Sequence, residues 1–168
     1  INNAVLEARD ELLKETSVFL ISGKQQYQEL RDATDERSGW RLEAFISEGM
    51  AEVLAAADLV VARAGATTLL ELAALHKPTI IIPNGLLTAG HQLKNAKVYQ
   101  DHLAAVVLSE DEMMRSSDVL AKKIIGLLKT TKILNGLGSN FGTFAKPHAA
   151  LDMAEMILTV IRRQGRKR

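Results

Sequence analysis

Cysteine is absent from the 168-residue sequence. Its absence excludes disulfide bridges and thiolate zinc sites, and it fits a reducing compartment. The formal net charge is only +1, which argues against nucleic acid as a partner, because proteins that bind nucleic acid in bulk usually carry a strong basic excess. No run of residues approaches the roughly 18 consecutive apolar positions that a membrane-spanning helix needs.

Patterns typical of catalytic and metal sites are also missing. The four histidines are scattered along the chain, at positions 76, 91, 102 and 148, and their spacing matches no set of zinc ligands. His91 has no carboxylate partner in the nearby sequence, as an acid–base pair would require. We therefore expect no metal, no cofactor and no catalytic residue in this chain.

A signal peptide is missing too. The sequence opens "INNAVLEARDELL", without methionine and already in a helical pattern. We therefore expect a piece cut from a longer protein. Its length still suffices for one domain with a sizeable core.

The most informative stretch runs from Ala57 to Pro83. A short β-branched run over 59–61 predicts a strand that is covered on both faces. A turn of small residues over 63–66 follows, and Thr67 or Thr68 is suited to cap the next helix. That helix carries an apolar face, and a second strand follows over 79–82. The face comprises Leu69, Leu70, Leu72 and Ala73.

The rest of the chain repeats this alternation. The patterns predict further helices over 4–13, 24–35, 50–58 and 93–102, the first capped by Asn2 or Asn3, and further strands over 17–22, 40–45 and 104–109. Beyond Glu110 the pattern is helical, with a break at 135–142 and a restart at Pro147, and residues 162–168 look unstructured. Such alternation predicts an α/β fold with a doubly wound, Rossmann-like parallel sheet.

Two glycine-containing turns are candidate nucleotide loops. The run 136–142, "GLGSNFG", lacks the full G-x-G-x-x-G spacing and follows no strand, so we interpret it as a capped connection between helices. Gly65 lies between a strand and a helix, where backbone can approach a phosphate closely and the helix presents free N–H groups. The alternative is that any strand-to-helix turn prefers small residues.

Polar side chains near this turn strengthen the nucleotide hypothesis. Glu71 is placed to accept both hydroxyls of a ribose, although an acid near a helix N-terminus is also common on solvent-exposed surfaces. After the next strand, His91 or Gln92 shares a helix face with Asn95. The alternative for these three residues is a polar first turn that faces solvent.

In order and spacing, "ADLVVARAGATTLLELAALHKPTIIIP", "HQLKNA" and "FAKPHAALDMAEMI" resemble the C-terminal half of a family of bacterial transferases of peptidoglycan synthesis. These enzymes, of glycosyltransferase family 28, transfer N-acetylglucosamine (GlcNAc) from UDP-GlcNAc to lipid I and form lipid II, a step in cell-wall biogenesis and cell division. The resemblance covers nearly the whole chain. His148 departs from it, because an aspartate is frequent at that place.

The resemblance implies one half of a GT-B glycosyltransferase, the half that holds the donor, and a role for each site residue. The backbone of Ile46 would contact the uracil edge, Thr68 would lie near the phosphates and Glu71 on the ribose hydroxyls. Gln92, Asn95 and His91 would hold the GlcNAc. The implied UDP-GlcNAc site comprises Ile46, Arg63, Gly65, Ala66, Thr67, Thr68, Leu69, Leu70, Glu71, His91, Gln92 and Asn95.

The resemblance also implies a domain over residues 1–161 and a basic tail over 162–168. The family's first strand and its Gly-Gly-Ser phosphate loop would fall upstream of Ile1. Lipid I and the general base would belong to an N-terminal domain, so we expect this chain alone to be an inactive part of an inverting hexosyltransferase. Five basic residues lie within the seven of the tail, Arg162, Arg163, Arg166, Lys167 and Arg168, so the tail could hold the enzyme near anionic lipid at the cytoplasmic face of the cell membrane. The alternative is a solvated, disordered terminus.

Two alternatives remain at this stage. One is a non-catalytic UDP-sugar-binding subunit that needs a membrane partner for GlcNAc transfer. The other is an unrelated nucleotide-binding domain, such as half of a dehydrogenase, which the lack of a strand leading into a dinucleotide loop disfavours.

Overall fold

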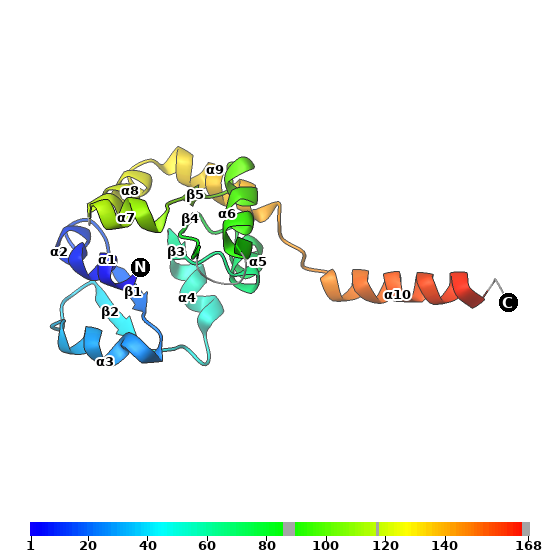
Figure 1. Cartoon of the computed structure of the whole chain (residues 1–168), viewed down its shortest axis with the longest axis horizontal. Coiled ribbons are helices and arrows are strands. Elements are labelled where there is room, and N and C mark those ends of the chain that lie inside the picture. Colours follow the sequence, from blue (N-terminus) through cyan, green and yellow to red (C-terminus); the bar gives the residue numbers. More distant parts are fainter. Residues whose placement is uncertain (86–89, 117, 166–168) are drawn as a thin grey trace.

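A computed structural model describes residues 1–85, 90–116 and 118–165, and Figure 1 shows its arrangement. Short strands alternate with helices up to β5, and the chain is helical beyond it. The strands are β1 (Val18–Ile21), β2 (Trp40–Glu43), β3 (Val60–Ala62), β4 (Thr79–Ile81) and β5 (Val106–Val107). The helices are α1 (Asn2–Glu7), α2 (Arg9–Leu12), α3 (Lys24–Asp32), α4 (Met50–Ala56), α5 (Ala66–Ala74), α6 (His91–Asp101), α7 (Glu110–Arg115), α8 (Asp118–Leu128), α9 (Thr131–Gly142) and α10 (Ala149–Gly165).

All strand pairs are parallel, which confirms the predicted α/β class. β1 pairs with β2 in one sheet, with Val18 opposite Trp40. β3, β4 and β5 form a second sheet in that order. The parallel strands thus fall into two sheets, and among the described residues no ladder joins β1 to β3.

β4 is the most deeply buried strand. Thr79, Ile80 and Ile81 all have 0% of their surface exposed, because β4 has a paired strand on each side and packed layers on both faces. The run of β-branched residues that predicted a covered strand is what such a position requires. Thr79 satisfies its hydroxyl by donating a hydrogen bond to the carbonyl of Lys77, at 2.8 Å.

Helices join the two sheets. α1 and α2 pack against α8, which in turn packs against α9. The contacts of α5 with α9 and of α3 with β2 lie beside one sheet each. One hydrophobic cluster contains Leu20 of β1 together with Ile80 of β4, so the core is continuous between the sheets. A second cluster lies between α5, α6 and α9, where Tyr99 contacts the rings of Phe141 and Phe144 at centroid distances of 4.6 and 4.4 Å. Burial raises the pKa of Tyr99.

α9 corrects one prediction. The break expected at 135–142 is wrong, because α9 continues through this run and ends at Gly142. Gly138 serves close packing, because a Cβ there would lie 2.5 Å from the carbonyl oxygen of His76. A glycine in a helix usually indicates an end, but here it lets another segment of backbone approach. The chain leaves the helical state only after Gly142.

The predicted caps of the first helix are also wrong. Ile1 is the N-cap of α1 and makes no side-chain cap. Asn2 instead donates hydrogen bonds to the carbonyl of Ser22 at 2.8 Å and to Oε1 of Gln26 at 2.7 Å. The side-chain amide of Asn2 therefore bonds residues that follow β1 rather than the first turn of its own helix.

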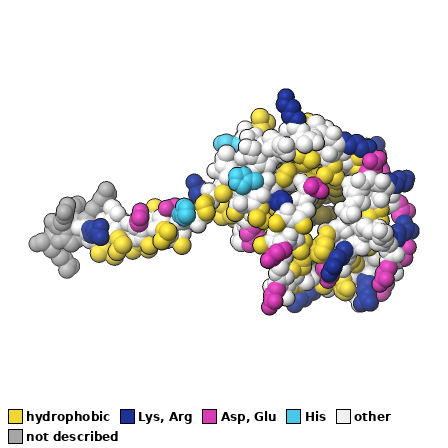
Figure 2. Space-filling model, turned by 180° about the vertical axis from the view of Figure 1, so that it is seen from behind, with side chains coloured by type: hydrophobic (Ala, Val, Ile, Leu, Met, Phe, Trp, Pro, Cys, Tyr) yellow, Lys and Arg dark blue, Asp and Glu magenta, His cyan; other side chains and the backbone are white. Residues whose placement is uncertain are grey.

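α10 extends away from the rest of the molecule (Figures 1 and 2). It continues to Gly165, so residues 162–165 are helical and not unstructured as expected; residues 166–168 lie outside the described residues. Its large apolar side chains are exposed, and Figure 2 shows them along the helix: Leu151, Met153, Met156, Ile157, Leu158, Val160 and Ile161. Within the described ranges, no helix combines the length and apolar character needed to cross a membrane.

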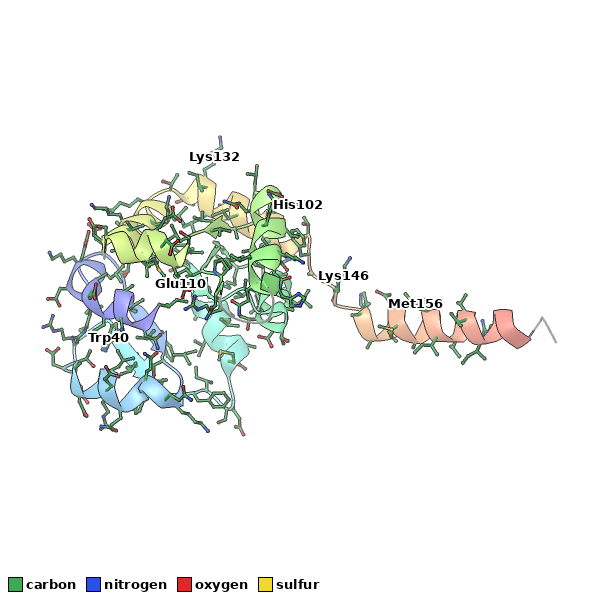
Figure 3. The ribbon with its side chains drawn as sticks, in the orientation of Figure 1. Trp40, His102, Glu110, Lys132, Lys146 and Met156 are labelled. Carbon is green, nitrogen blue, oxygen red and sulfur yellow. The ribbon has the colours of Figure 1, made fainter. Side chains whose placement is uncertain are left out.

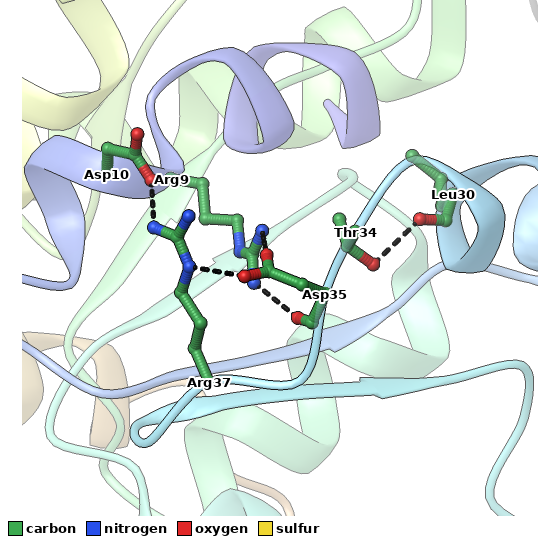
Figure 4. A network of polar contacts seen from close by, with 6 residues as sticks. All are labelled: Arg9, Asp10, Leu30, Thr34, Asp35 and Arg37. Atoms are coloured by element: carbon green, nitrogen blue, oxygen red, sulfur yellow. Dashed lines mark hydrogen bonds and ion pairs between the residues drawn. The ribbon is translucent and has the colours of Figure 1, made fainter.

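An ion-pair network fixes the loop before β2 (Figure 4). The buried guanidinium of Arg9 donates to Oδ1 of Asp35 at 2.7 Å and lies 4.9 Å from the ring centre of Trp40. Arg37 pairs with Asp35 at 2.9 Å and with Asp10 at 2.6 Å. The network therefore ties α2 to the loop that leads into β2.

A cleft of about 1990 Å³ separates the two sheets. β1 and β3 form its walls, and Val5 of α1 and Leu12 of α2 lie among its other lining residues. In Figure 1 the N-terminus lies between β1 and β3, and Ile1 contributes to the lining.

Candidate functional site

The candidate site begins where β3 ends. Gly65 is the N-cap of α5, with φ −72° and ψ 130°, and it makes no side-chain cap. The prediction that Thr67 or Thr68 caps this helix is therefore wrong. The first helical hydrogen bond runs from the N–H of Leu69 to the carbonyl of Gly65, at 3.0 Å. The N–H groups of the preceding turn have no partner within the helix, which is what an anion site at a helix start requires.

Arg63 is held in a fixed position beside this turn. Its Nη1 donates to the carbonyl of Ile82 at 3.2 Å, and its Nη2 pairs with Glu110 at 2.6 Å. Both side chains of the pair are 34% exposed. Glu110 is the first residue of α7 and is labelled in Figure 3. The ion pair spans the carboxyl ends of the three-stranded sheet, because β3, β4 and β5 end at the segments that carry these residues.

Sequence reasoning missed Glu110. The signal was present: Ser109 forms a capping box with Glu112 and so marks a helix start directly after β5. Because parallel strands end at one edge of a sheet, an acid at this start lies near the end of β3.

α5 presents Thr68 and Glu71 to the cleft. The two residues lie three positions apart on the helix and both line the cleft. Thr68 is partly buried and Glu71 is exposed. The predicted apolar face is right for Leu69, which is 1% exposed, and wrong for Leu70, which is 47% exposed. The side chain of Leu69 therefore belongs to the core, and only its backbone belongs to the candidate site.

Two side chains of α6 form hydrogen bonds with the backbone of the segments that follow β3 and β4. It starts at His91, two residues before the predicted helix. Asn95 donates to the carbonyl of Ala64 at 3.1 Å, and Gln92 accepts from the backbone N–H of Asn84 at 2.9 Å. His91 is exposed. The structure therefore brings Gln92 and Asn95 to the ends of β4 and β3; residues 86–89 of the loop between them are outside the described residues.

Ile46 belongs to a different region. It is partly buried in the segment between β2 and α4, beside the two-stranded sheet. The lining of the cleft includes Arg63, Thr68 and Glu71 but not Ile46. The candidate residues therefore form two groups, one around α5 and α6 and one after β2.

Metal ligands do not gather in the part of the chain that the structure describes. Within residues 1–85, 90–116 and 118–165, no three His, Cys, Asp or Glu side chains are placed to hold a metal ion.

Comparison with known proteins gives concordant results. The glycosyltransferase family 28 C-terminal domain matches residues 1–150. The chain is 32% identical over 152 residues to the UDP-N-acetylglucosamine–N-acetylmuramyl-(pentapeptide) pyrophosphoryl-undecaprenol N-acetylglucosamine transferase of Listeria monocytogenes serotype 4a (strain HCC23), covering 89% of this chain and 41% of that protein. It is 33% identical over 167 residues to transferase 1 of the same name from Bacillus cereus (strain ATCC 10987), covering 97% and 45%.

Among solved structures, MurG of Acinetobacter baumannii superposes with a TM-score of 0.72 at 26% identity, covering 94% of this chain and 46% of that one. This agreement confirms the Rossmann-like GT-B arrangement. The chain spans less than half the length of these relatives. Since the family match extends over most of its residues, the chain belongs to the glycosyltransferase family 28 C-terminal domain family.

Proposed function

We propose that this chain is the donor-binding half of a transferase that moves GlcNAc from UDP-GlcNAc to lipid I and forms lipid II. One observation carries the proposal: the free N–H groups of the first turn of α5 lie on the same helix as Thr68 and Glu71, and both side chains line one cleft. The names of the relatives, which state this donor sugar and this acceptor, support it.

Each group then has a chemical task. Breaking the glycosidic bond leaves a UDP diphosphate, whose added negative charge needs donors already in place. Backbone N–H groups at the start of α5 supply them, with Thr68 beside the phosphates and Glu71 on the ribose. Gln92 and Asn95, with His91 next to them, hold the sugar, and the backbone of Ile46 contacts the uracil.

The acceptor and the general base lie outside this chain in the proposal. Inverting transfer needs a base near the acceptor hydroxyl, and we place both in the N-terminal half of a longer protein. The chain alone should bind UDP or UDP-GlcNAc weakly and transfer nothing. If the purified chain alone transferred GlcNAc to lipid I, this division of labour would be wrong.

Glu71→Gln tests the donor site directly. Loss of a charge-assisted hydrogen-bond pair costs roughly 1.5–3 kcal/mol, so the Kd for UDP should rise about tenfold to a hundredfold or more. Titration calorimetry measures the Kd, and thermal unfolding should stay near that of the parent. Glu29→Gln, at another exposed helix acid, is the matched control and should leave the Kd unchanged. Equal UDP affinity for Glu71→Gln and the parent would make Glu71 an ordinary surface acid.

We also propose that the C-terminal end of the chain contacts an anionic lipid surface at the cytoplasmic face of the membrane. Arg162 is exposed on α10, whose large apolar side chains are exposed as well; the side chains of Arg163 and of Arg166, Lys167 and Arg168 are outside the described residues. Basic residues contribute about 1 kcal/mol each near such a surface, and the attraction is screened by salt over about 8 Å at physiological ionic strength.

Co-sedimentation with vesicles tests this contact. The chain should bind vesicles rich in phosphatidylserine at low salt and dissociate from them when salt is added. The chain without residues 162–168 should bind these vesicles less. Vesicles of phosphatidylcholine alone are the control. Equal and negligible binding of both chains to the anionic vesicles would contradict the proposed contact and indicate that the tail is only a solvated, charged terminus.

A further inference from the structure

Arg63 is held by two contacts and keeps further donors. Its Nη1 donates to the carbonyl of Ile82 at 3.2 Å, and its Nη2 lies 2.6 Å from Oε1 of Glu110. A guanidinium carries more N–H groups than these two contacts use. Among the residues that the structure describes, Arg63 has no further hydrogen-bond partner. Arg63 therefore has N–H groups left for a ligand in the cleft that it lines.

Glu110 lies on a turn whose backbone is fixed on both sides. The N–H of Leu108 donates to the carbonyl of Ile81 at 3.0 Å and so continues the pairing of β5 with β4. The N–H of Ser109 donates to Oε2 of Glu112 at 2.8 Å, and the N–H of Glu112 donates to Oγ of Ser109 at 3.2 Å. Sheet pairing and this capping box together determine where Glu110 lies.

The pair lies where a ligand can reach it. Arg63, Ile82 and Glu110 follow β3, β4 and β5, at the edge of the sheet where α5 starts. Both side chains of the pair are 34% exposed, and ion pairs with access to solvent add little to stability. Arg63 also lines the cleft together with Thr68 and Glu71. Stability alone gives little reason for the pair, whereas its position gives it access to a ligand at the helix start.

We propose that Glu110 is a positioning residue for donor binding: it holds the guanidinium of Arg63 so that the unused N–H groups face the phosphates of a nucleotide bound at the start of α5. The proposal rests on the donor site proposed above. A guanidinium binds phosphate oxygens through a planar fork, so its orientation matters. A long side chain that is already ordered also loses less freedom when the ligand binds. Glu110 touches no part of the ligand and acts only through Arg63.

Glu110 has two effects on a bound phosphate, and they have opposite signs. Its negative charge repels the phosphates, which weakens binding. Its contact with Arg63 orders the guanidinium, which strengthens binding. Glu110→Gln and Glu110→Ala remove the charge equally, but only glutamine keeps a side-chain oxygen that accepts from Nη2 of Arg63. A comparison of these two variants therefore isolates the positioning effect.

The Kd of the two variants for UDP is the main test. Amide NMR shifts of the full chain, titrated with UDP, measure this Kd even when binding is weak. We expect the Kd of Glu110→Ala to exceed that of Glu110→Gln by about two- to tenfold, the range that the ordering of one long side chain supplies. Uridine, which has no phosphate, should bind both variants equally. Equal UDP affinities, or the same difference for uridine, would overturn the proposal.

Arg63→Ala tests whether Glu110 acts through Arg63. Without the guanidinium, Glu110→Ala and Glu110→Gln should have the same Kd for UDP, because the effects of two residues that act as a unit do not add. A difference that persisted would show that Glu110 acts by another route. Asp111→Ala, at the exposed next residue of α7, is the matched control and should leave the Kd of the parent unchanged. If Asp111→Ala shifted the Kd as much as Glu110→Ala does, the charge of α7 and not the contact with Arg63 would be responsible.

A measurement without nucleotide separates this proposal from the donor site. The NMR order parameter of the Nε–H group of Arg63 reports how firmly the side chain is held. It should be high in the parent and in Glu110→Gln, and lower in Glu110→Ala. Failure of the parent to bind UDP would contradict the donor site and this proposal with it. UDP binding by the parent, together with equal order of Arg63 in all of these chains, would overturn the positioning role alone.

Discussion

The two halves of the molecule bury the side chains of their strands to different extents. The three-stranded half, β3 to β5 with α5, α6 and α9, contains residues such as Ile81 with 0% of their surface exposed. The two-stranded half, β1 and β2 with α1 to α3, leaves Phe19 of β1 40% exposed. Both halves use parallel pairs. The difference is the number of neighbours, because β4 is paired on both sides and β1 on one.

The halves also use different contacts between their elements. In the three-stranded half, Tyr99 and Phe141 pack ring against ring, and Gly138 lets α9 approach the backbone of His76. In the two-stranded half, Arg9 and Asp35 form part of an ion-pair network (Figure 4). Apolar packing does not depend on pH, whereas an ion pair does. Stability in the two halves should therefore respond to different perturbations.

The largest effect should come from the central strand. Ile81→Ala leaves a cavity beside β3 and β5 and should reduce the free energy of unfolding by about 2–5 kcal/mol. Phe19→Ala is the matched change in the two-stranded half. It should cost less than about 1.5 kcal/mol, since full burial of a Phe side chain is worth about 1.5–3 kcal/mol. Urea unfolding followed by circular dichroism measures both values. Similar losses would show that the burial of β4 is not what distinguishes the halves.

A smaller effect should come from the glycines of α9. Gly138→Ala places a Cβ 2.5 Å from the carbonyl oxygen of His76, so backbone must move, at a cost of about 1–3 kcal/mol. Gly136→Ala lies on the same helix with nothing within 4 Å of the added Cβ. It should stabilise the protein by roughly 0.5–1 kcal/mol through helix propensity. Thermal unfolding of the two variants gives the sign directly, and a gain from both would show that α9 does not need the close contact.

The smallest effect should be the pH response of the two-stranded half. Hydrogen bonds from Arg37 and then Arg9 lower the pKa of Asp35 from 3.8 to about 2. A lowered folded-state pKa gives stability that is present above the unfolded value, near 3.8, and is lost as the pH falls toward about 2. The network should therefore loosen over this acid range.

Trp40 reports this loosening. It is the single tryptophan of the chain and lies under Arg9, so its fluorescence should change between about pH 4 and pH 2. Asp35→Asn should remove that titration and leave exchange at the amides of β4 as it was. A change that persisted unaltered in Asp35→Asn would assign the acid response to other groups.

The local sequence pattern was enough to predict those helices and strands whose burial follows from their own residues. The strand over 59–61 and the helix after Gly65 were predicted within a few residues, because a β-branched run and a small-residue turn have few other uses. Glu71 was placed about one turn into that helix by its position alone, whereas the cleft that it shares with Thr68 came from the structure. The family was identified from this stretch together with "HQLKNA" and "FAKPHAALDMAEMI", and the match over residues 1–150 confirms it.

Partners distant in sequence decided the rest. The sequence could not predict that Arg63 pairs with Glu110, that Asn95 bonds the carbonyl of Ala64, or that Gly138 lies inside a helix. Nor could it show two sheets with facing edges, since strand pairing is a long-range choice. A residue pattern determines which face of an element is apolar and how its backbone runs. Which other element covers that face, and which polar group remains for a ligand, depends on contacts between segments tens of residues apart, and only the tertiary structure supplies those.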